Sequence, residues 1–260
     1  MISFARLTRR VTLSFVLIGT TAMACTSRAR DQDDDDDEDG GTPAAGAAAA
    51  PSPATVVNRS PSTAQGTTTW TFDSLSIGQP PAGFSFGRTG SGRPGRWVVR
   101  AAADAPSASN VLAQEDSDRT DYRFPLAVAD GPSFRDVSVA VRCKPVSGRV
   151  DRACGLVWRY QDENNYYLTR ANALEDNVCW YYVQHGRRVE VKRVHLPVAS
   201  GVWHSLRADM RGDHVEVYFN GTKLIDVHDS RFTAPGKIGV WTKADSHTLF
   251  DDLTATALAP

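Results

Sequence analysis

Residues 155–177 read GLVWRYQDENNYYLTRANALEDN, two short runs of β-branched and aromatic residues separated by polar residues. The runs Gly155–Tyr160 and Tyr166–Ala171 have the length of ordinary β-strands, in which Val, Tyr and Trp are enriched. Between them, Asp162–Asn165 are residue types that favour a tight turn. The stretch therefore predicts an antiparallel β-hairpin.

The same pattern continues on both sides of this hairpin, as short β-rich runs divided by turn residues, with little helical periodicity. Asn220-Gly221 is the strongest hairpin signal because both residues tolerate the positive φ of a type I′ turn, and His185-Gly186 is a weaker one. Strands repeating at intervals of about 8 to 12 residues predict an all-β sandwich or barrel. The other clear runs are Val137–Cys143, Val178–Val183, Val189–Val194, Trp203–Met210, Val215–Phe219, Lys223–Val227 and Ile238–Trp241.

The composition limits the class of protein. A net charge of −1, with 41% hydrophobic and 23% charged residues, excludes a fully disordered chain, a polytopic membrane protein and a strongly basic nucleic-acid binder. After the first quarter of the 260-residue chain, roughly 190 residues remain, enough for one full-sized hydrophobic core. From Thr68 onward basic and acidic side chains nearly balance, so we expect no nucleic-acid partner.

Residues 1–24 have the three parts of a secretory signal peptide: a basic start, an apolar stretch from Val11 to Ile18, and small residues at the end. The next residue, Cys25, resembles the acylated cysteine of a bacterial lipobox, whereas Ala22-Met23-Ala24 would also suit ordinary signal peptidase. We therefore expect export, either as a lipoprotein anchored through Cys25 to the bacterial outer membrane or cell surface, or as a periplasmic or secreted protein.

Residues 25–67 contain the acidic block Asp33–Asp39, an Ala/Pro/Gly stretch and a polar tail. Such a segment has too little apolar surface to offset the entropy lost on ordering, so it is predicted to be a disordered tether. The folded domain is accordingly predicted to span residues 68–260.

Three stretches resemble a known group of folds. They are residues 155–177 quoted above, GVWHSLRADMRGDHVEVYFNG (201–221) and GKIGVWTKADSHTLFDDL (236–253). They are similar to the concanavalin A-like, laminin-G-like jelly rolls, and among these to the bacterial 3-keto-disaccharide hydrolase domain group. The resemblance implies a jelly-roll β-sandwich, with a glycan bound across its concave face. It also implies glycoside hydrolysis as an activity, although fold alone does not establish function.

The domain contains three cysteines, an odd number that in an exported protein suggests one disulfide and one spare thiol. Strand alternation turns both Cys143 and Cys154 toward the core, and pairing them as hairpin neighbours would set Val141 opposite Leu156. We therefore predict a Cys143–Cys154 disulfide, with two buried free thiols as the alternative. Cys179 has the opposite parity and is expected to be the exposed spare thiol.

A ligand-binding face follows from the same alternation. With Trp158 and Tyr160 turned inward, Arg159 points outward, and the predicted turn pairs Arg159 with Leu168. Aromatic rings stack on the apolar face of a sugar, and arginine forks bind its hydroxyls or a carboxylate. This face therefore predicts a carbohydrate site, the alternative being that these are ordinary surface residues. The outward residues are Arg159, Tyr166, Arg170, Asn172, Trp241 and Lys243.

Glycoside cleavage would also need two carboxyl groups. Glu175, in the loop that ends the predicted face, is the candidate for one of them, as a general base. Glu163 and Asp162 are weak options for the second. The alternative roles are turn formation for Asp162, and strand-end capping or an arginine salt bridge for Glu175.

A structural calcium ion is a further possibility, since jelly rolls bring their first and last strands side by side. Asp73 near the first strand and Asp251 or Asp252 in the last would then supply oxygen ligands. The histidines show no zinc-binding spacing, and there is no phosphate-binding glycine loop.

Three functions remain open from the sequence. The first is glycan binding by an exported, lipid-anchored jelly-roll protein. The second is a glycoside hydrolase of the 3-keto-disaccharide type, and the third is a non-catalytic adhesive or structural protein of the cell envelope.

Overall fold

The computed structural model describes residues 66–259, which form strands and connecting turns without any helix. The predicted signal peptide, Cys25 and nearly all of the predicted tether lie outside the described residues. Within the described part of the chain, no helix has the length and hydrophobicity needed to cross a membrane. The strands are β1 (Thr67–Trp70), β2 (Phe84–Gly90), β3 (Trp97–Ala101), β4 (Asn110–Gln114), β5 (Arg123–Ala129), β6 (Val137–Ser147), β7 (Ala153–Asp162), β8 (Asn165–Asn172), β9 (Asn177–Gln184), β10 (Arg187–His195), β11 (His204–Arg211), β12 (His214–Phe219), β13 (Thr222–His228), β14 (Lys237–Trp241) and β15 (His247–Ala257).

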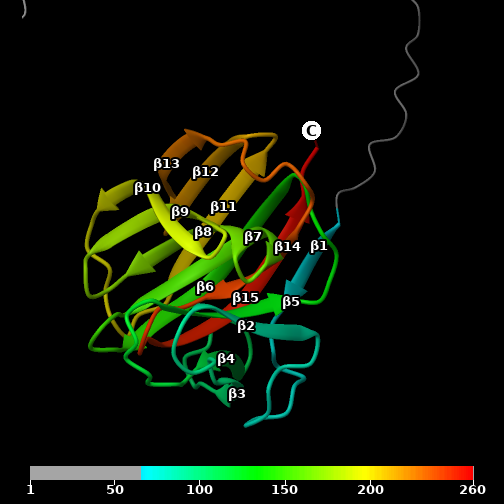
Figure 1. Ribbon diagram of the computed structural model, residues 1–260. Helices are drawn as coiled ribbons and strands as arrows, with labels where there is room; N and C mark the ends of the chain where they lie inside the picture. Colours follow the sequence, from blue (N-terminus) through cyan, green and yellow to red (C-terminus); the bar gives the residue numbers. More distant parts are fainter. Residues whose placement is uncertain (1–65, 260) are drawn as a thin grey trace, which may run out of the picture. The chain divides into compact units, whose positions relative to one another are not determined.

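The strands form two antiparallel sheets packed into a sandwich (Figure 1). The eight-stranded sheet has the order β13-β12-β11-β6-β15-β4-β3, with β1 paired to β15. The seven-stranded sheet has the order β10-β9-β8-β7-β14-β5-β2. The first and last strands therefore lie side by side, as the resemblance implied. Each of the nine predicted β-rich runs overlaps an observed strand, so the all-β prediction is confirmed.

Side chains between the two sheets form the main hydrophobic core. Along β6, every second residue from Val137 to Cys143 is buried, the alternation expected of a strand with one face in a core. The rings of Trp158, Tyr167 and Trp180, one from each of three adjacent strands, follow one another at centroid spacings of 5.8 Å. Each such buried side chain contributes roughly 1.5–3 kcal/mol or more to stability.

The hairpin formed by β7 and β8 differs from its prediction in register. Asp162 pairs with Asn165, which leaves a two-residue turn, and Val157 pairs with Leu168. An irregularity after Trp158 shifts the pairing between these two points, because a β-bulge inserts extra residues into one strand. The predicted pairings that are wrong are Gln161 with Tyr166 and Arg159 with Leu168.

The bulge reverses which side chains face the core. Arg159 lies in the left-handed region, with φ of 44°, and turns inward. Tyr160 instead packs beside Tyr166 on the outer face, with ring centroids 5.9 Å apart. The strict alternation assumed from the sequence therefore holds only as far as Trp158.

The predicted turns and the disulfide are present. Asn220-Gly221 and His185-Gly186 both have positive φ at both residues, as type I′ turns require. Cys143 and Cys154 form a disulfide. However, β6 and β7 belong to different sheets, so this bond joins the two layers of the sandwich, and the predicted hairpin pairing between these strands is wrong.

Cys179 is a buried free thiol, not an exposed one. Its parity does place it on the outer face of the seven-stranded sheet, but that face is itself covered. Burial raises the pKa of the Cys179 thiol, which disfavours the thiolate needed for nucleophilic chemistry.

Candidate functional site

The outer face of the seven-stranded sheet carries a second cluster of packed side chains. The ring of Trp241 points to this side, as predicted, but it is fully buried and lies 5.3 Å from Phe124. The guanidinium of Arg188, from β10, covers the rings of Phe124, Tyr181 and Trp241 at 4.4, 4.7 and 5.7 Å. The face is therefore a closed aromatic layer under an arginine instead of an open stacking platform.

Tyr122 holds this cover in place. Its hydroxyl donates to the Gly186 carbonyl at 3.1 Å and accepts from the Arg188 N–H at 2.7 Å, which ties the start of β5 to the β9–β10 turn. Tyr166 is buried beneath, with its hydroxyl 2.7 Å from the Thr89 hydroxyl, and burial raises its pKa. Tyr166 therefore shares the face as predicted, but its polar group already has a partner.

Arg159 does not belong to this face. Its guanidinium donates to the carbonyls of Arg135, Phe232 and Gly212 at 2.5–2.9 Å and lies 3.5 Å from the carboxylate of Asp136. Only 1% of its side chain is exposed. The prediction that Arg159 shares the outward face is wrong, because the β7 bulge turns it against the loops of the opposite sheet.

Arg170 stands at the other end of the sheet, in a polar cluster. Its Nη1 donates to Asn177 Oδ1 at 2.7 Å, and its Nη2 donates to Glu175 Oε2 at 2.8 Å and to the Tyr181 hydroxyl at 3.0 Å. The Arg170 side chain is 2% exposed, whereas that of Glu175 is 38% exposed. The buried Arg170 thus fixes the position of the Glu175 carboxylate at the surface.

The loop between β8 and β9 positions this carboxylate. The side-chain oxygen of Asn172 accepts from the backbone N–H groups of Leu174 and Glu175 at 2.8 and 3.2 Å, which shapes the turn. Asp176 then adopts positive φ, and the chain re-enters the sheet at Asn177. The residues singled out in ANALEDN are therefore brought together by local geometry.

A second carboxylate, Asp151, lies fully buried beside this cluster. Its Oδ1 accepts from Asn172 Nδ2 at 3.0 Å, and its Oδ2 lies 3.1 Å from Lys243 Nζ. Lys243 also contacts the exposed Asp121 at 2.7 Å. Together with Arg170 and Glu175, these residues make a charged group, which we call the Arg170 cluster: Asp151, Arg170, Asn172, Glu175, Asn177, Tyr181 and Lys243.

The pKa values of the two carboxyl groups of the Arg170 cluster are shifted in opposite directions. Burial raises the pKa of Asp151 more than Arg170 and Lys243 lower it. Burial also acts to raise the pKa of Glu175, but Arg170, Asn177 and Lys243 outweigh it and hold the pKa below its usual value. Two neighbouring carboxyls with opposite shifts are typical of acid–base sites.

Several polar atoms on this face have no hydrogen-bond partner among residues 66–259. They are Arg170 Nε, Arg188 Nη1 and Trp241 Nε1, all buried donors. Since buried donors are nearly always satisfied in proteins, each unpaired one favours an external partner such as a water molecule or a ligand hydroxyl.

Asp162 and Glu163 lie far from Glu175. Asp162 accepts from Asn164 N–H and Asn165 Nδ2, the turn-forming role given as its alternative. These residues precede β8 and Glu175 follows it, and a strand of eight residues separates its ends by roughly 25 Å. This exceeds the separation of about 5–9.5 Å between catalytic carboxyls of glycosidases, so neither can be the partner of Glu175.

Asp73 and Asp251 do converge, as the proposed calcium site requires. Both accept from the Ser107 hydroxyl, at 3.4 and 2.9 Å, and they also accept backbone N–H bonds from Asn110 and Asp252 respectively. Asp252 contributes its backbone N–H to this network, and its residue has positive φ. The carboxylate oxygens are thus engaged by donors, and a calcium ion there stays a prediction.

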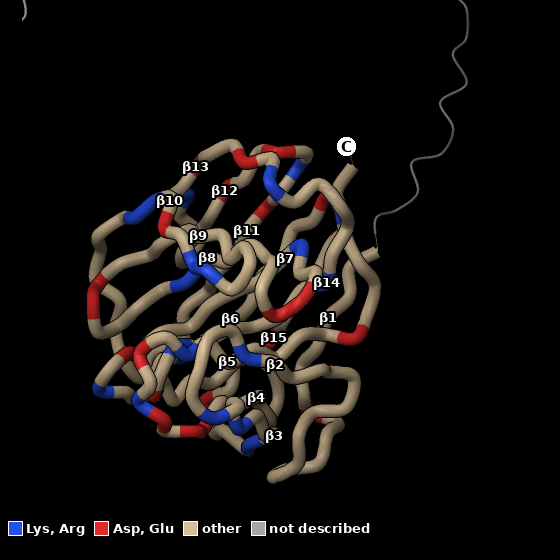
Figure 2. Tube along the Cα trace, in the orientation of Figure 1, with Lys and Arg blue, Asp and Glu red and all other residues tan. Residues whose placement is uncertain are grey.

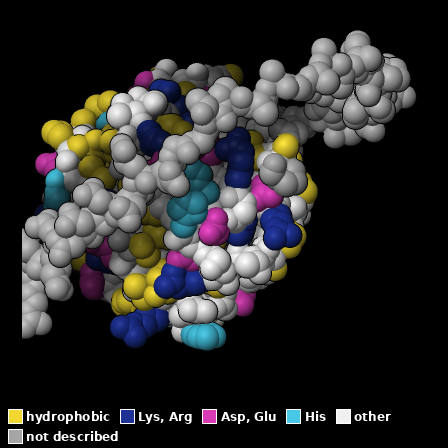
Figure 3. Space-filling view, turned by 90° about the horizontal axis from the view of Figure 1, so that it is seen from above, with side chains coloured by type: hydrophobic (Ala, Val, Ile, Leu, Met, Phe, Trp, Pro, Cys, Tyr) yellow, Lys and Arg dark blue, Asp and Glu magenta, His cyan; other side chains and the backbone are white. Residues whose placement is uncertain are grey.

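Within the described residues, one other group has the geometry to hold a metal: His214, Glu216 and Asp226. Lys223 Nζ lies 2.9 Å from Glu216 and 2.7 Å from Asp226, so an ammonium group already balances the charge of the two carboxylates. Acidic and basic residues are interspersed in this way over the strands and loops (Figure 2), and histidines lie among charges of both signs on the face seen in Figure 3.

Sequence reasoning missed Asp151, Tyr181 and Arg188. Tyr181 is on the predicted run Val178–Val183, and Arg188 directly precedes the predicted run Val189–Val194. A complete parity count along these two runs could have placed both on the outward face. Asp151 lies in a loop before β7, where no periodicity applies. Its position follows from Asp245, whose carboxylate accepts the N–H groups of residues 149–151.

Comparison with known proteins supports the fold. No family model matches the chain. A segment of 134 residues is 28% identical to part of a levanase from Bacillus subtilis (strain 168), which covers 50% of this chain and 19% of that enzyme. The chain thus spans about a fifth of the length of the curated relative that it matches.

Among solved structures, the carbohydrate-binding module CBM66 from Bacillus subtilis matches with a TM-score of 0.53 and 18% identity, over 66% of this chain and 95% of the module. A β-glucanase from Bacillus licheniformis matches with a TM-score of 0.49 and 12% identity, over 76% and 100% of the two chains. The prediction of a concanavalin A-like jelly-roll β-sandwich is confirmed. The narrower likeness to the 3-keto-disaccharide hydrolase group stays a prediction.

Proposed function

We propose that this protein binds a glycan, and that the Arg170 cluster provides the binding site. The observation that carries the proposal is the buried Arg170, whose hydrogen-bond acceptors are side chains and include the partly exposed Glu175. Three buried donors on the same face, one of them Arg170 Nε, have no partner among the described residues. Burying charges is costly unless they are paired, so a cluster of this kind is retained at a binding or catalytic site more readily than in a purely structural core.

The chemistry of the Arg170 cluster suits sugar hydroxyls. Glu175 is ionised and accepts hydrogen bonds, while Lys243 and the Arg170 fork donate them. The aromatic layer beneath Arg188 offers ring faces to the apolar side of a sugar, provided that the Arg188 side chain swings away. A ligand with adjacent hydroxyls would therefore replace Arg188 and satisfy the unpaired donors.

Two similarities support a saccharide as the ligand class. A levanase is similar in sequence over a 134-residue segment, and one of the solved structures with the same fold is a carbohydrate-binding module. Levan is accordingly the first polysaccharide to test. We also propose export and a lipid anchor on Cys25, on the basis of the sequence of residues 1–25 alone. These residues lie outside the described part of the structure.

The test is binding of the full chain to a glycan array that includes levan, followed by titration calorimetry with and without added calcium. We expect saturable binding that Arg170→Lys abolishes or weakens strongly, while Arg211→Lys, an exposed arginine on the opposite sheet, leaves it unchanged. Absence of binding to every glycan on the array would contradict the proposal and favour an adhesive or structural protein of the envelope.

A second candidate function is glycoside hydrolysis of the 3-keto-disaccharide type. It is favoured by the presence of two carboxyl groups, Glu175 and Asp151, in the Arg170 cluster. Glu175 is partly exposed and its pKa is lowered, which suits a general base, whereas burial raises the pKa of Asp151. Hydrolysis predicts turnover of a 3-keto-disaccharide that is lost in Glu175→Gln while binding persists. Binding without turnover in the unmodified protein would rule out this second function.

A further inference from the structure

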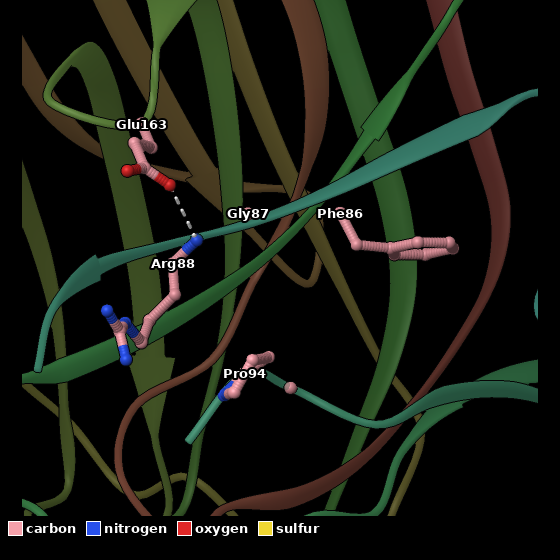
Figure 4. A pocket seen from close by; sticks show the side chains of 6 residues that line it. Phe86, Gly87, Arg88, Pro94 and Glu163 are labelled. Atoms are coloured by element: carbon pink, nitrogen blue, oxygen red, sulfur yellow. Dashed lines mark hydrogen bonds between the residues drawn. The ribbon is translucent and has the colours of Figure 1, made fainter. Parts of the chain in front are cut away.

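A separate groove lies at the open edge of the sandwich, between the edge strand β2 and the loop before β3. Two adjoining hollows of about 220 and 380 Å³ share Phe86 and Gly95 in their walls. Together they have the size of a small-molecule site, about 300–1,000 Å³. Figure 4 shows the first hollow, with Phe86 on one side of Gly87, the Arg88 side chain and the Glu163 carboxylate on the other, and Pro94 across from them.

Phe86 is the aromatic side chain of this groove. It is 43% exposed, and its neighbours Ser85 and Gly87 on β2 are not buried either. Phe86 pairs with Ala127, whose side chain belongs to the core between the sheets, so Phe86 faces the same gap but extends past its edge. A ring at this place offers an apolar face to a ligand without first uncovering a core.

Polar groups without full partners surround that ring. Trp97 is 97% buried, and its indole Nε1 has no acceptor in the described part of the chain. Arg88 donates to the Gly92 carbonyl, but its buried Nε is unpaired within residues 66–259. Glu163 Oε2 accepts only the Arg88 backbone N–H, at 3.2 Å, so this carboxylate retains acceptor capacity.

Gly95 lets the floor of the groove pack closely against Trp97 and Pro125. A β-carbon at this position would lie 2.7 Å from Trp97 Nε1 and 2.7 Å from the Pro125 side chain. The indole Nε1 of Trp97, which has no acceptor among the described residues, therefore lies directly against Gly95, a residue that lines both hollows. Phe86 and Trp97 both line the second hollow, with this donor buried behind Gly95 in its wall.

From these contacts we infer that the groove is a second saccharide-binding site, which holds one sugar residue against Phe86. The Glu163 carboxylate and the Arg88 guanidinium bind neighbouring hydroxyls, and the Trp97 indole N–H donates to a third polar atom. The inference does not depend on the Arg170 cluster, because Glu163 and Glu175 lie at opposite ends of β8.

Addition of a peptide strand to the β2 edge is disfavoured by the same contacts. Such a strand would need the outward backbone groups of β2, and the Arg88 N–H is already bonded to Glu163. The Thr89 hydroxyl also donates to the Glu163 carbonyl at 2.5 Å, so the β7–β8 turn covers this part of the edge. A small ligand with hydroxyl groups fits the remaining space better than a continuous strand.

The experiment follows the indole N–H signals of the full chain by NMR. The chain contains six tryptophans, and Trp97→Phe assigns the signal of interest. The protein carries Arg170→Lys to weaken the first site, and the probes are a levan oligosaccharide, arabinotriose and a β-glucan tetrasaccharide. We expect at least one probe to shift the Trp97 signal. The apparent dissociation constant obtained from that shift should rise by about tenfold in Phe86→Ala.

The controls separate this groove from the first site and from self-association. Val202→Ala removes an equally exposed apolar side chain and is expected to change nothing, and Glu163→Gln should weaken binding without loss of stability. The inference is overturned if no probe shifts the Trp97 signal, whether or not the unmodified Arg170 cluster binds. It is also overturned if the shift is unaffected by Phe86→Ala, or if Phe86→Ala instead abolishes a dimer seen by ultracentrifugation.

Discussion

Arg159 and Arg170 stand on neighbouring strands of the seven-stranded sheet, and both are almost completely buried, yet their partners differ in kind. Arg159 donates to three main-chain carbonyls from separate segments. Arg170 donates to three side chains, and its Nε stays unpaired in the described structure. Arg159 holds separate loops together through their carbonyls. The side chains bound by Arg170 can instead exchange this partner for a ligand. Burial alone therefore does not separate an arginine that only holds loops together from one that is a candidate for ligand binding.

The largest expected effect is on stability, at Arg159. Arg159→Met leaves three carbonyls without their donor and Asp136 without its cation, so we expect the free energy of unfolding to fall by about 3–5 kcal/mol. Urea unfolding measures this, and glycan binding by the folded fraction should be unchanged. A loss smaller than that caused by Arg170→Met would contradict the structural role of Arg159.

The disulfide tests whether the two layers of the sandwich position the binding site. Cys143 and Cys154 are eleven residues apart in the sequence, and their disulfide closes this loop in the unfolded chain. Replacing both by alanine raises the entropy of the unfolded chain and should lower the free energy of unfolding by about 3 kcal/mol. Glycan affinity should remain the same, because Arg170 is held by hydrogen bonds within the seven-stranded sheet. A parallel loss of affinity in calorimetry would show instead that the bond between layers shapes the Arg170 cluster.

Arg170→Lys tests the second arginine of the comparison, as Arg159→Met tests the first. Lysine keeps the positive charge but cannot reach Glu175, Asn177 and Tyr181 at once, as the guanidinium fork does. We expect levan-oligosaccharide binding to fall by roughly 10–100-fold, since hydrogen bonds to charged groups contribute about 1.5–3 kcal/mol. Stability should fall less than in Arg159→Met. Unchanged affinity would move the site away from the Arg170 cluster.

Trp241→Phe is a smaller and more specific change than truncation to alanine, which would leave a cavity beside Phe124. Phenylalanine keeps most of the packing and removes the unpaired indole N–H. We expect affinity to fall by about fivefold to tenfold, with stability almost unchanged. An unaltered dissociation constant would show that this donor does not contact the ligand.

The pH dependence of binding reports on Glu175. Because its pKa is held below the usual value, the carboxylate is ionised from neutral pH down to acidic conditions, and its pairing with Arg170 is lost only as pH falls through the lowered pKa. Affinity should therefore stay level between about pH 7 and pH 5 and decline below about pH 4. Glu175→Gln should remove this acidic decline, and a decline near pH 6 would point to a histidine.

The positions of most β-strands were predictable because alternation and turn chemistry are local. Asn220-Gly221 and His185-Gly186 form the turns that their residue types favour, and all nine singled-out runs are strands. β1–β5 and β15 were not singled out, and two of these strands have atypical sequences. β5 contains Pro125, and the run of β15 is interrupted by Asp251-Asp252, where Asp252 has positive φ.

The site was predictable in part for the same reason. Arg170, Asn172 and Glu175 belong to one strand end and its turn, so their proximity follows from short-range geometry. Arg159 was misplaced because a bulge changes the parity of a strand without leaving a clear mark in the sequence.

The sequence by itself determined the fold class, the outward direction of Trp241 and the inward direction of Cys143 and Cys154, the two cysteines of the disulfide, since each depends on alternation along single strands. Only the tertiary structure decided that this disulfide joins two sheets, that Arg188 covers the aromatic layer, and that Asp151 lies beside Arg170. These depend on which strands far apart in the chain become neighbours, and on how far a curved sheet brings its ends together. That information is carried by the packing of the whole domain and by no single stretch of residues.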